Sequence, residues 1–344
     1  MSIETKTEAF DNNVPSEWQA LLRKDAILRI IGLRAEYRTE RARVSALNGL
    51  DLVIHKGESL GLVGETGAGK TTAALSILNL LPKDIGFITE GSITYHDEDV
   101  QKMSISKLRD MRGSKISMIF QNPLTALNPV FTIGEQIAMV LRVHQKLRNK
   151  DAFNRAGELL EMVGIPAYRV KDYPYQFSGG MRQRVGIAAA LACNPQLLIA
   201  DEPTTALDVT IQAQILELMR ELQTKYDSSL LMITHNLGII SELCQQVAVM
   251  YGGRTIEYGE AIDVFASPMH PYTVGLIGAL PALEGARNRL VAIPGVIADP
   301  QNLPGGCAFH PRCEYCKEEC KTTQPLMTHA GNNHFVACYQ YGEG

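Results

Sequence analysis

The 344-residue sequence predicts an α/β fold, and three observations support this prediction. Short apolar segments that suit β-strands alternate with segments that have helical spacing. A glycine-rich pattern typical of phosphate binding stands between one such strand and one such helix. The composition is that of a globular protein, since 45% of the residues are hydrophobic and 20% are charged.

The expected elements follow from this alternation, taken in chain order. The first 26 residues are polar and predict a loosely held tail with a short helix at 16–23. After residue 260 the texture changes to prolines and cysteines, which places a domain boundary near residue 261. We expect strands at 26–35, 45–54, 57–64, 91–95, 115–120, 197–200, 229–234 and 247–251, and helices at 71–81, in most of 131–168, at 178–191 and at 210–226.

Charge and hydropathy exclude several classes of protein. The net charge is −4 and the pI is near 6.1, whereas a general nucleic-acid binder is usually basic. No apolar run approaches the roughly 20 residues of a membrane-spanning helix. The polar, acidic N-terminus does not resemble a secretory signal. We therefore expect a cytoplasmic chain that binds no nucleic acid and acts at a membrane only through a partner.

Residues 64–71 form the pattern G-x-x-x-x-G-K-[ST] of a P-loop, directly after an apolar strand and before a helix. Its glycines let backbone N–H groups surround phosphate oxygens, and the positive end of the next helix faces them. Lys70 would reach the β- and γ-phosphates, and the Thr71 hydroxyl would bind Mg²⁺. The predicted ATP-binding residues here are Gly64, Glu65, Thr66, Gly67, Ala68, Gly69, Lys70, Thr71 and Thr72.

Two acids, Asp201 and Glu202, end the apolar run at 197–200. An apolar run of this length is typical of a buried parallel strand. Asp201 would hold the Mg²⁺ shell, and Glu202 would activate or orient the attacking water. Exposed acids often end strands, so the pattern gains its weight from the P-loop upstream.

The order of these and further motifs resembles the ATP-binding cassette (ABC) ATPases. The run Phe177-Ser178-Gly179-Gly180-Met181 is similar to that family's LSGGQ signature, with Phe in place of Leu and Met in place of Gln. Gln121 matches the Q-loop, Ala206-Leu207-Asp208 the D-loop and His235 the switch histidine. Tyr37 stands where the family places a ring against adenine.

The resemblance covers about residues 27–260 and implies a fold. That fold has a RecA-like core, an antiparallel β subdomain and an α-helical subdomain at about 125–190. The resemblance also implies roles in catalysis for Glu202, His235 and Gln121, and Mg²⁺ ligation by Thr71, Gln121 and Asp201.

The same resemblance implies a second subunit. The signature residues Phe177, Ser178, Gly179, Gly180 and Met181 would bind the ATP of that partner, so that two subunits enclose two ATP molecules head to tail. Asp208 would lie at the dimer seam, and Tyr37 would stack on adenine. Plainer alternatives remain, because Ser178 and Asp208 also suit helix N-caps and Tyr37 suits a half-buried loop.

The last part of the chain, residues 261–344, resembles the tail of the ABC subunits that energise oligopeptide, dipeptide and nickel importers. The matching segments are His270-Pro271-Tyr272-Thr273, Ile293-Pro294-Gly295 and the run GCAFHPRC at 306–313. The chain has seven cysteines, of which five lie within 307–338. In a cytosolic chain such a cluster predicts a metal site rather than disulfides, with free or buried thiols as the alternative.

The resemblance implies a 4Fe-4S cluster held by Cys307, Cys313, Cys320 and Cys338. Four thiolates suit either this cluster or a zinc ion, and Cys316 could replace one ligand. A structural staple for the proline-rich tail is the favoured role, and a redox or iron sensor is the alternative.

These observations predict the ATP-hydrolysing subunit of an importer for di- or oligopeptides, at the cytoplasmic face of the cell (inner) membrane. The implied partners are a second, non-identical ABC ATPase subunit, two transmembrane permease subunits and an extracytoplasmic substrate-binding protein. A nickel, metallophore or other small-solute importer is the alternative substrate class. A soluble ABC ATPase of translation or DNA repair is disfavoured, since the chain has one cassette and no sustained heptads.

Overall fold

Two β-sheets lie at the centre of the computed structural model, which describes residues 18–19, 21, 26–40, 42–121, 126–204, 208–279 and 293–342. Within this part, an antiparallel sheet has the strand order β2-β1-β4-β5, and a mixed sheet has the order β11-β12-β10-β9-β3-β8-β7-β6. The strands are β1 (Ala26–Arg38), β2 (Arg43–His55), β3 (Ser59–Val63), β4 (Gly86–Tyr95), β5 (Glu98–Asp99), β6 (Ile116–Ile119), β7 (Leu197–Asp201), β8 (Ser229–Ile233), β9 (Gln246–Tyr251), β10 (Arg254–Glu260), β11 (Thr328–His329) and β12 (Phe335–Val336).

Helices connect and cover these strands. The α-helices are α2 (Lys70–Ile77), α3 (Ile105–Met111), α5 (Ile133–Gln145), α6 (Asn149–Met162), α7 (Gly179–Leu191), α8 (Val209–Tyr226), α9 (Leu237–Leu243), α10 (Ala261–Ala266), α11 (Pro271–Gly278) and α12 (Glu318–Thr322). Short 3₁₀ helices are η1 (Val100–Lys102), η2 (Ala167–Lys171), η3 (Pro174–Gln176) and η4 (His310–Arg312).

The mixed sheet has a parallel centre, in which β9, β3, β8, β7 and β6 are neighbours in that order. The strands β3, β7 and β8 are buried along their whole length, as expected for parallel strands covered on both faces. Parallel strands end at the same edge of a sheet. The segments that follow β3, β6, β7 and β8 therefore meet at one edge.

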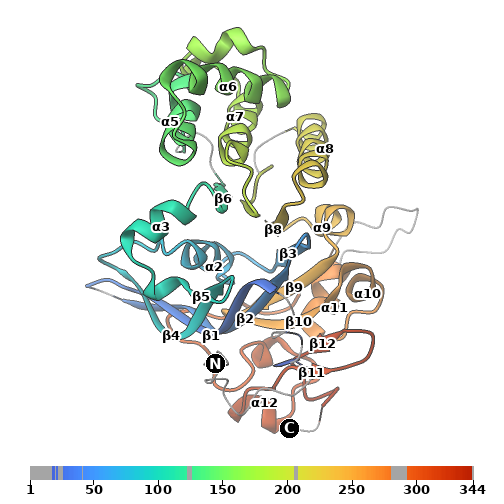
Figure 1. Cartoon of the computed structure of the whole chain (residues 1–344). Coiled ribbons are helices and arrows are strands. Elements are labelled where there is room, and N and C mark those ends of the chain that lie inside the picture. Colours follow the sequence, from blue (N-terminus) through green and yellow to red (C-terminus); the bar gives the residue numbers. More distant parts are fainter. Residues whose placement is uncertain are drawn as a thin grey trace, which may run out of the picture.

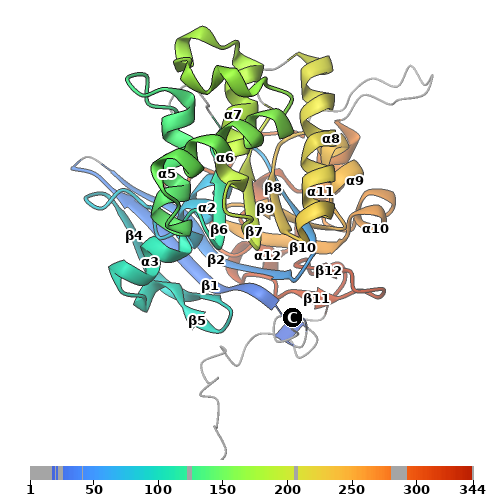
Figure 2. The ribbon, with the colours of Figure 1, turned by 45° about the horizontal axis from the view of Figure 1, so that its top comes forward.

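Side chains of the central strands alternate between two hydrophobic clusters. Leu198 and Ala200 of β7 pack with residues of α5 to α9. Leu197 and Ile199 pack with residues of α2, α3 and the antiparallel sheet. Figure 2 shows α7 and α8 in front of the strands of the mixed sheet. The parallel strands are thus enclosed on both faces.

Helices α5, α6 and α7 form a lobe that stands apart from the two sheets, shown in green at the top of Figure 1. Side-chain caps account for where two of them begin. Thr132 and Glu135 form a capping box at α5, and the Ser178 hydroxyl accepts the Met181 N–H at the start of α7. This helical lobe spans 133–191, close to the expected helical segment.

Residues 261–279 and 293–342, here called the C-terminal extension, add to the mixed sheet. β12 pairs with β10 through Tyr258 and Phe335, and β11 pairs with β12. Trp18 packs against both Tyr258 and Phe335, with ring centroids 5.2 and 5.0 Å apart. The residues of the extension from 293 on form the red region at the bottom of Figure 1, and α10 and α11 are the orange helices at the right. The composition changes near residue 261, but the extension packs directly onto the mixed sheet that precedes it.

The structure differs from the expected elements in several places. β4 begins at Gly86 rather than at residue 91. α2 ends at Ile77 rather than at residue 81, because Asn79 takes a left-handed conformation and Pro82 follows. β10, α3 and α9 have no counterpart among the expected elements. Of the helix expected at 16–23, only Trp18, Gln19 and Leu21 are described, all helical, and the rest of the tail lies outside the described residues.

Candidate functional site

The loops at the carboxyl edge of the parallel strands surround one open cavity of about 400 Å³. The lining residues come from four separate segments, which follow β3, β6, β7 and β8. They are Thr66, Gly67, Gly69, Lys70, Thr71, Thr72, Gln121, Glu202 and His235. A crevice outside the carboxyl ends of the strands is the usual ligand site of an open α/β sheet.

Two glycines shape the P-loop. Gly64 has a φ of 153° and Gly69 a φ of 102°, both in the region that disfavours other residues. A Cβ on Gly64 would lie 2.4 Å from the Met250 carbonyl oxygen, and one on Gly69 would lie 2.4 Å from that of Ala46. Gly69 stands at the N-cap of α2, and no side chain among the described residues caps that helix. The first N–H groups of α2 are therefore open to an anion.

Lys70 is the first residue of α2 and is buried. Its ammonium group donates to the carbonyl oxygens of Gly64 and Glu65, at 2.7 and 3.0 Å. Burial lowers the pKa of Lys70, and nearby carboxylates, above all Glu202, act in the opposite direction. The loop carbonyls thus hold a cationic head at the edge of the cavity.

Three predicted catalytic side chains meet in this cavity. Gln121 Nε2 donates to Glu202 Oε2 at 2.8 Å, and His235 Nδ1 lies 3.4 Å from Glu202 Oε1. Glu202 has a φ of 47°, an uncommon value for a residue other than glycine. Its N–H donates to the Ile233 carbonyl at the end of β8. Backbone and side-chain contacts together fix the Glu202 carboxylate toward the cavity.

Asp201 ends β7 and is only 2% exposed. Its carboxylate is hydrogen-bonded by the Thr71 side chain, while burial raises its pKa. Oδ1 of Asp201 is buried and has no hydrogen-bond partner among the described residues. A buried carboxylate oxygen without a partner, beside a threonine hydroxyl, suits an oxygen-liganded cation such as Mg²⁺.

Tyr37 lies on β1 at the margin of the P-loop helix. Its hydroxyl is 3.2 Å from Thr72 Oγ1, and the residue is partly buried. This contact places one face of the antiparallel sheet beside the start of α2.

The predicted signature lies on the helical lobe, and in the described part of the chain none of its residues lines the cavity. Ser178 caps α7, Gly179 has open space around its Cα, and Phe177 is buried beneath the Arg169 guanidinium at 4.2 Å. The Arg169 guanidinium also reaches the Met181 sulfur at 3.6 Å. The start of α7 therefore takes no part in the lining of the cavity beside its own P-loop.

Asp208 is the N-cap of α8, and its carboxylate accepts the Ile211 N–H at 2.9 Å. This is the plainer of the two roles that the sequence allows. Ala206 and Leu207, the other two residues of the predicted D-loop, lie outside the described residues.

Four C-terminal cysteines line a second pocket: Cys307, Cys313, Cys320 and Cys338. Cys316 does not line it and lies beside the Lys317 carbonyl instead. All seven cysteines of the chain are free of disulfides. Burial raises the pKa of Cys307 to about 11, and the other three thiols of the pocket add to this effect. The pocket therefore brings together the four predicted ligands.

No group of three or more His, Cys, Asp or Glu side chains is arranged to hold a metal ion within the described ranges. In the same part of the chain, every helix is too short or too polar to cross a membrane.

Two residues that contact the P-loop were not among the predicted site residues. Arg312 pairs with the Glu65 carboxylate, and the Tyr272 hydroxyl accepts the Glu65 N–H. Both lie in segments already singled out, at 270–273 and 306–313. Their contact with the P-loop spans 247 and 207 residues and has no signal in the sequence.

Comparison with known families gives two matches. A family described as "ABC transporter" matches residues 47–205, and a family described as "Oligopeptide/dipeptide transporter, C-terminal region" matches residues 256–320. The two matched regions together include every cavity-lining residue except His235, and three of the four cysteines that line the second pocket.

Similar proteins match over most of the chain. The oligopeptide transport ATP-binding protein AppD of Bacillus subtilis is 48% identical over 320 residues, which is 92% of this chain and 97% of the relative. The oligopeptide transport ATP-binding protein OppD of Escherichia coli is 44% identical, over 88% of this chain and 90% of the relative. A dimeric ATP-binding cassette, MJ0796, solved with ADP and Pi, matches 68% of this chain and 98% of its own with a TM-score of 0.61 and 26% identity.

Proposed function

The chain belongs to the ABC transporter ATPases, in their oligopeptide/dipeptide branch, and we propose that it is the ATP-hydrolysing subunit of an importer for di- and oligopeptides. One observation supports this proposal most directly. The P-loop, Gln121, Glu202 and His235 line a single cavity at the carboxyl edge of the sheet. The peptide substrate rests on the relatives, which are oligopeptide transport ATP-binding proteins.

The cavity suits ATP hydrolysis, since each of its groups has a task in phosphoryl transfer. The open N–H groups of the P-loop and α2 bind the phosphates, and Lys70 reaches the β- and γ-phosphate oxygens. Glu202 orients the attacking water and accepts its proton, while Gln121 and His235 hold that carboxylate in place. Tyr37 stacks on the adenine ring.

Asp201, Thr71 and Gln121 are the residues that would hold Mg²⁺. The unpartnered oxygen of Asp201 fits this role. A bound Mg²⁺ would supply positive charge that offsets the negative charge of the phosphates.

The signature residues complete a second subunit's site in this proposal. The α7 N-terminus can bind the γ-phosphate on the P-loop of a partner, which we expect to be a non-identical ABC ATPase subunit. Asp208 would then lie at the seam between the subunits. The head-to-tail arrangement is supported by the position of α7 in the helical lobe (Figure 1) and by the absence of the signature residues from the lining of the chain's own cavity among the described residues.

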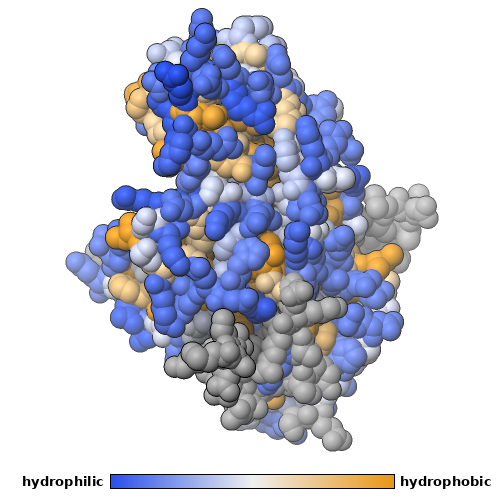
Figure 3. Space-filling model, viewed as in Figure 1, coloured by the Kyte–Doolittle hydropathy of each residue, from blue (hydrophilic) through white to orange (hydrophobic). Residues whose placement is uncertain are grey.

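We propose that the helical lobe docks onto two permease subunits at the cytoplasmic face of the membrane. Figure 3 shows hydrophobic side chains at the surface of this lobe. Large exposed side chains on it and just before it are Val130, Phe131, Met139, Val143, Tyr168, Tyr173 and Tyr175. These residues follow Gln121 in the chain. The proposed docking surface and a side chain of the ATP-binding cavity therefore lie on one continuous segment. A substrate-binding protein outside the membrane would deliver the peptide.

We further propose that Cys307, Cys313, Cys320 and Cys338 hold a 4Fe-4S cluster. Their shared pocket supports this choice of ligands over one that includes Cys316. Burial raises the pKa values of Cys307, Cys313 and Cys338, and a cationic metal group would offset this by stabilising their thiolates. We favour a structural role, since the extension has few helices or strands of its own.

Transport can be tested in cells whose chromosomal copy carries Lys70→Ala. We expect uptake of a labelled oligopeptide to be lost and uptake of labelled nickel to be unchanged. Lys56→Ala replaces an exposed lysine and serves as the matched control. Loss of nickel uptake instead would support the alternative substrate class, and no change in either would contradict the importer assignment.

The cluster can be tested by purifying the full chain without oxygen. We expect broad visible absorbance and about four irons and four sulfides per chain. Cys338→Ser should remove both signals, whereas Cys316→Ser should leave them unchanged. A colourless protein with one zinc per chain would show that the four cysteines bind zinc and not a cluster. Absence of both metals would show that the thiols are free.

A further inference from the structure

Two side chains of the C-terminal extension hold Glu65, the second residue of the P-loop. Arg312 forms a bidentate ion pair with the Glu65 carboxylate, at N–O distances of 2.7 and 3.2 Å. The Tyr272 hydroxyl accepts the backbone N–H of Glu65 at 2.8 Å. The extension therefore fixes both the side chain and the backbone of one P-loop residue.

Arg312 is itself firmly held. Its side chain is 4% exposed, its Nε donates to the Pro294 carbonyl at 2.9 Å, and Nη1 donates to the Tyr251 hydroxyl at 3.3 Å. The guanidinium also lies near the rings of Tyr251 and Phe309. A buried, bidentate arginine is more directional than an exposed pair, because its planar fork fixes both bonds at once. The Glu65 carboxylate thus has a rigid anchor.

Tyr272 is fixed in a similar way. It is fully buried, and its ring packs on Tyr251 and Phe309 at centroid distances of 4.8 and 5.5 Å. His270, two residues before it, caps the start of α11: its ring Nδ1 accepts the Tyr272 N–H. The backbone N–H of His270 donates to the buried Glu257 carboxylate. The hydroxyl cannot leave the P-loop unless the start of α11 moves with it.

The peptide unit between Gly64 and Glu65 connects these contacts to Lys70. Its N–H is held by Tyr272, and its C=O accepts from the Lys70 ammonium at 2.7 Å. A peptide unit is planar, so fixing the N–H direction also fixes the C=O direction. The extension thereby controls an acceptor that positions the phosphate-binding lysine.

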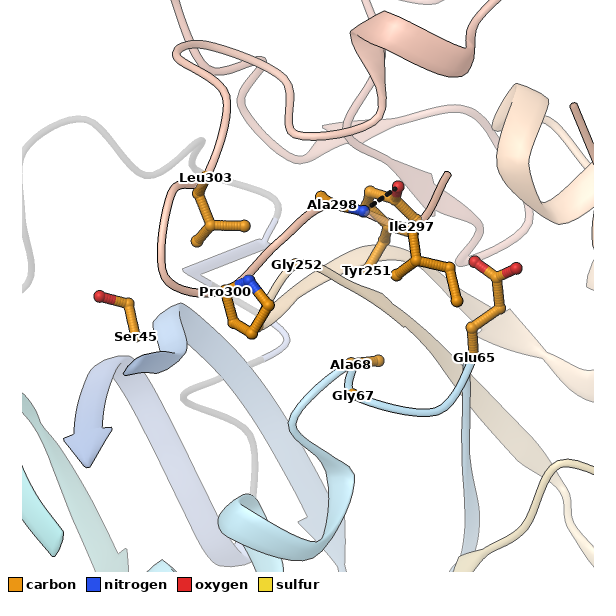
Figure 4. A pocket seen from close by; sticks show the side chains of 11 residues that line it. Ser45, Glu65, Gly67, Ala68, Tyr251, Gly252, Ile297, Ala298, Pro300 and Leu303 are labelled. Carbon is orange, nitrogen blue, oxygen red and sulfur yellow. Dashed lines mark hydrogen bonds between the residues drawn. The ribbon is translucent and has the colours of Figure 1, made fainter. Parts of the chain in front are cut away.

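The contact between extension and P-loop extends beyond these hydrogen bonds. Figure 4 shows Glu65 and Ala68 facing Ile297, Ala298 and Pro300 of the extension across a small pocket. One side of the P-loop therefore rests on the extension, and its other side borders the cavity.

We propose that Arg312 and Tyr272 are positioning residues for ATP binding: they fix the first peptide of the P-loop and so set where the Lys70 ammonium lies. This inference rests on the proposed function of the cavity. The segment that carries Arg312 also borders the cysteine-lined pocket, because the next residue, Cys313, lines that pocket. The state of that pocket is thus connected to the ATP site through one short segment.

The test compares variants of the full chain in its assembled transporter. Arg312→Met should raise the Kd and KM for MgATP about tenfold, the size expected for losing one charge-assisted pair, with kcat changed less than twofold. Arg312→Lys should recover part of this loss. In the double variant E65Q/R312M no unpaired carboxylate remains but the anchor is still missing, so the KM should stay raised about as far as in R312M, whereas a return to the parent value would attribute the loss to the unpaired charge.

Phe335→Leu is the matched control, because Phe335 of β12 also joins the extension to the mixed sheet, through ring contacts with Tyr258 and Trp18, and these contacts do not involve Glu65 or Tyr272. We expect it to lower the melting temperature and to leave the KM unchanged. Tyr272→Phe is the milder second variant and should raise the KM about threefold, the smaller loss expected for one neutral hydrogen bond.

Two outcomes are distinguishable. Equal KM values for the parent, R312M and Y272F proteins, with only the melting temperature lowered, would overturn the positioning role. If the parent complex itself neither binds nor hydrolyses ATP, the proposed function fails and not merely this inference.

Discussion

The helices α2 and α7 both begin at glycine-containing turns, and they differ in the residues around their N-termini. α2 starts at a buried lysine without a side-chain cap, next to Gln121, Glu202 and His235. α7 starts after Ser178, whose hydroxyl caps the helix, and among the described residues its start does not line the cavity that holds Gln121, Glu202 and His235. The N-terminus of α2 therefore lies among the predicted phosphate-binding and catalytic residues, whereas the N-terminus of α7 has no such residues in a shared cavity.

Under the proposed function, this difference assigns the two helix starts to two ATP sites. The residues that line the chain's own cavity follow strand ends of the mixed sheet. The α7 N-terminus lies on the helical lobe, and under the proposed function it meets a phosphate bound by another subunit. Substitutions at the two helices should therefore affect different ATP molecules, and this difference can be measured.

The largest effect is expected for Glu202→Gln, on the α2 side of the comparison. Without the carboxylate that orients water and accepts its proton, ATP hydrolysis should fall by at least about 100-fold. The Kd for MgATP should change less than twofold, because the P-loop and Lys70 remain. Steady-state hydrolysis and equilibrium binding measure the two quantities, and the exposed Glu158→Gln on α6 is the control. Retained hydrolysis would mean that another group is the base.

A smaller effect is expected for Gly179→Asp, on the α7 side. A carboxylate at this helix N-terminus should repel the partner's γ-phosphate and lower hydrolysis by the assembled complex about tenfold. Binding of MgATP to the isolated chain should not change.

Gly186→Asp is the matched control for this variant. Both glycines lie on α7, and a Cβ at either position meets no atom within 4 Å. The two variants should therefore differ only in their distance from the helix N-terminus. Equal losses in both would show that the effect is on α7 itself and not on a phosphate.

The sequence predicts the strand ends of this site well, because local patterns specify them. An apolar run before a P-loop, or before Asp201 and Glu202, predicts a buried strand from its own residues alone. The parallel order then brings the loops together at one edge. The cavity lined by Lys70, Glu202 and His235 follows from that rule.

Features that depend on distant pairing are not predictable in this way. β11 and β12 have two residues each and exist as strands only through β10. β10 itself follows Gly252 and Gly253, both with positive φ, which form a tight turn after β9. The contacts of Arg312 and Tyr272 with Glu65 join segments more than 200 residues apart. No local periodicity reports such contacts.

The smallest expected effect is on stability, from removal of the side-chain cap of α7 or of α5. Ser178→Ala removes the α7 cap and should lower the free energy of unfolding by about 1 kcal/mol. Thr132→Ala removes the cap of α5 on the same lobe and should cost a similar amount. Urea denaturation measures both. If the Ser178 hydroxyl also serves a partner's phosphate, only Ser178→Ala will in addition slow hydrolysis by the assembled complex. Equal hydrolysis in the two variants would reduce Ser178 to a helix cap, and the α7 site would then depend on its backbone N–H groups alone.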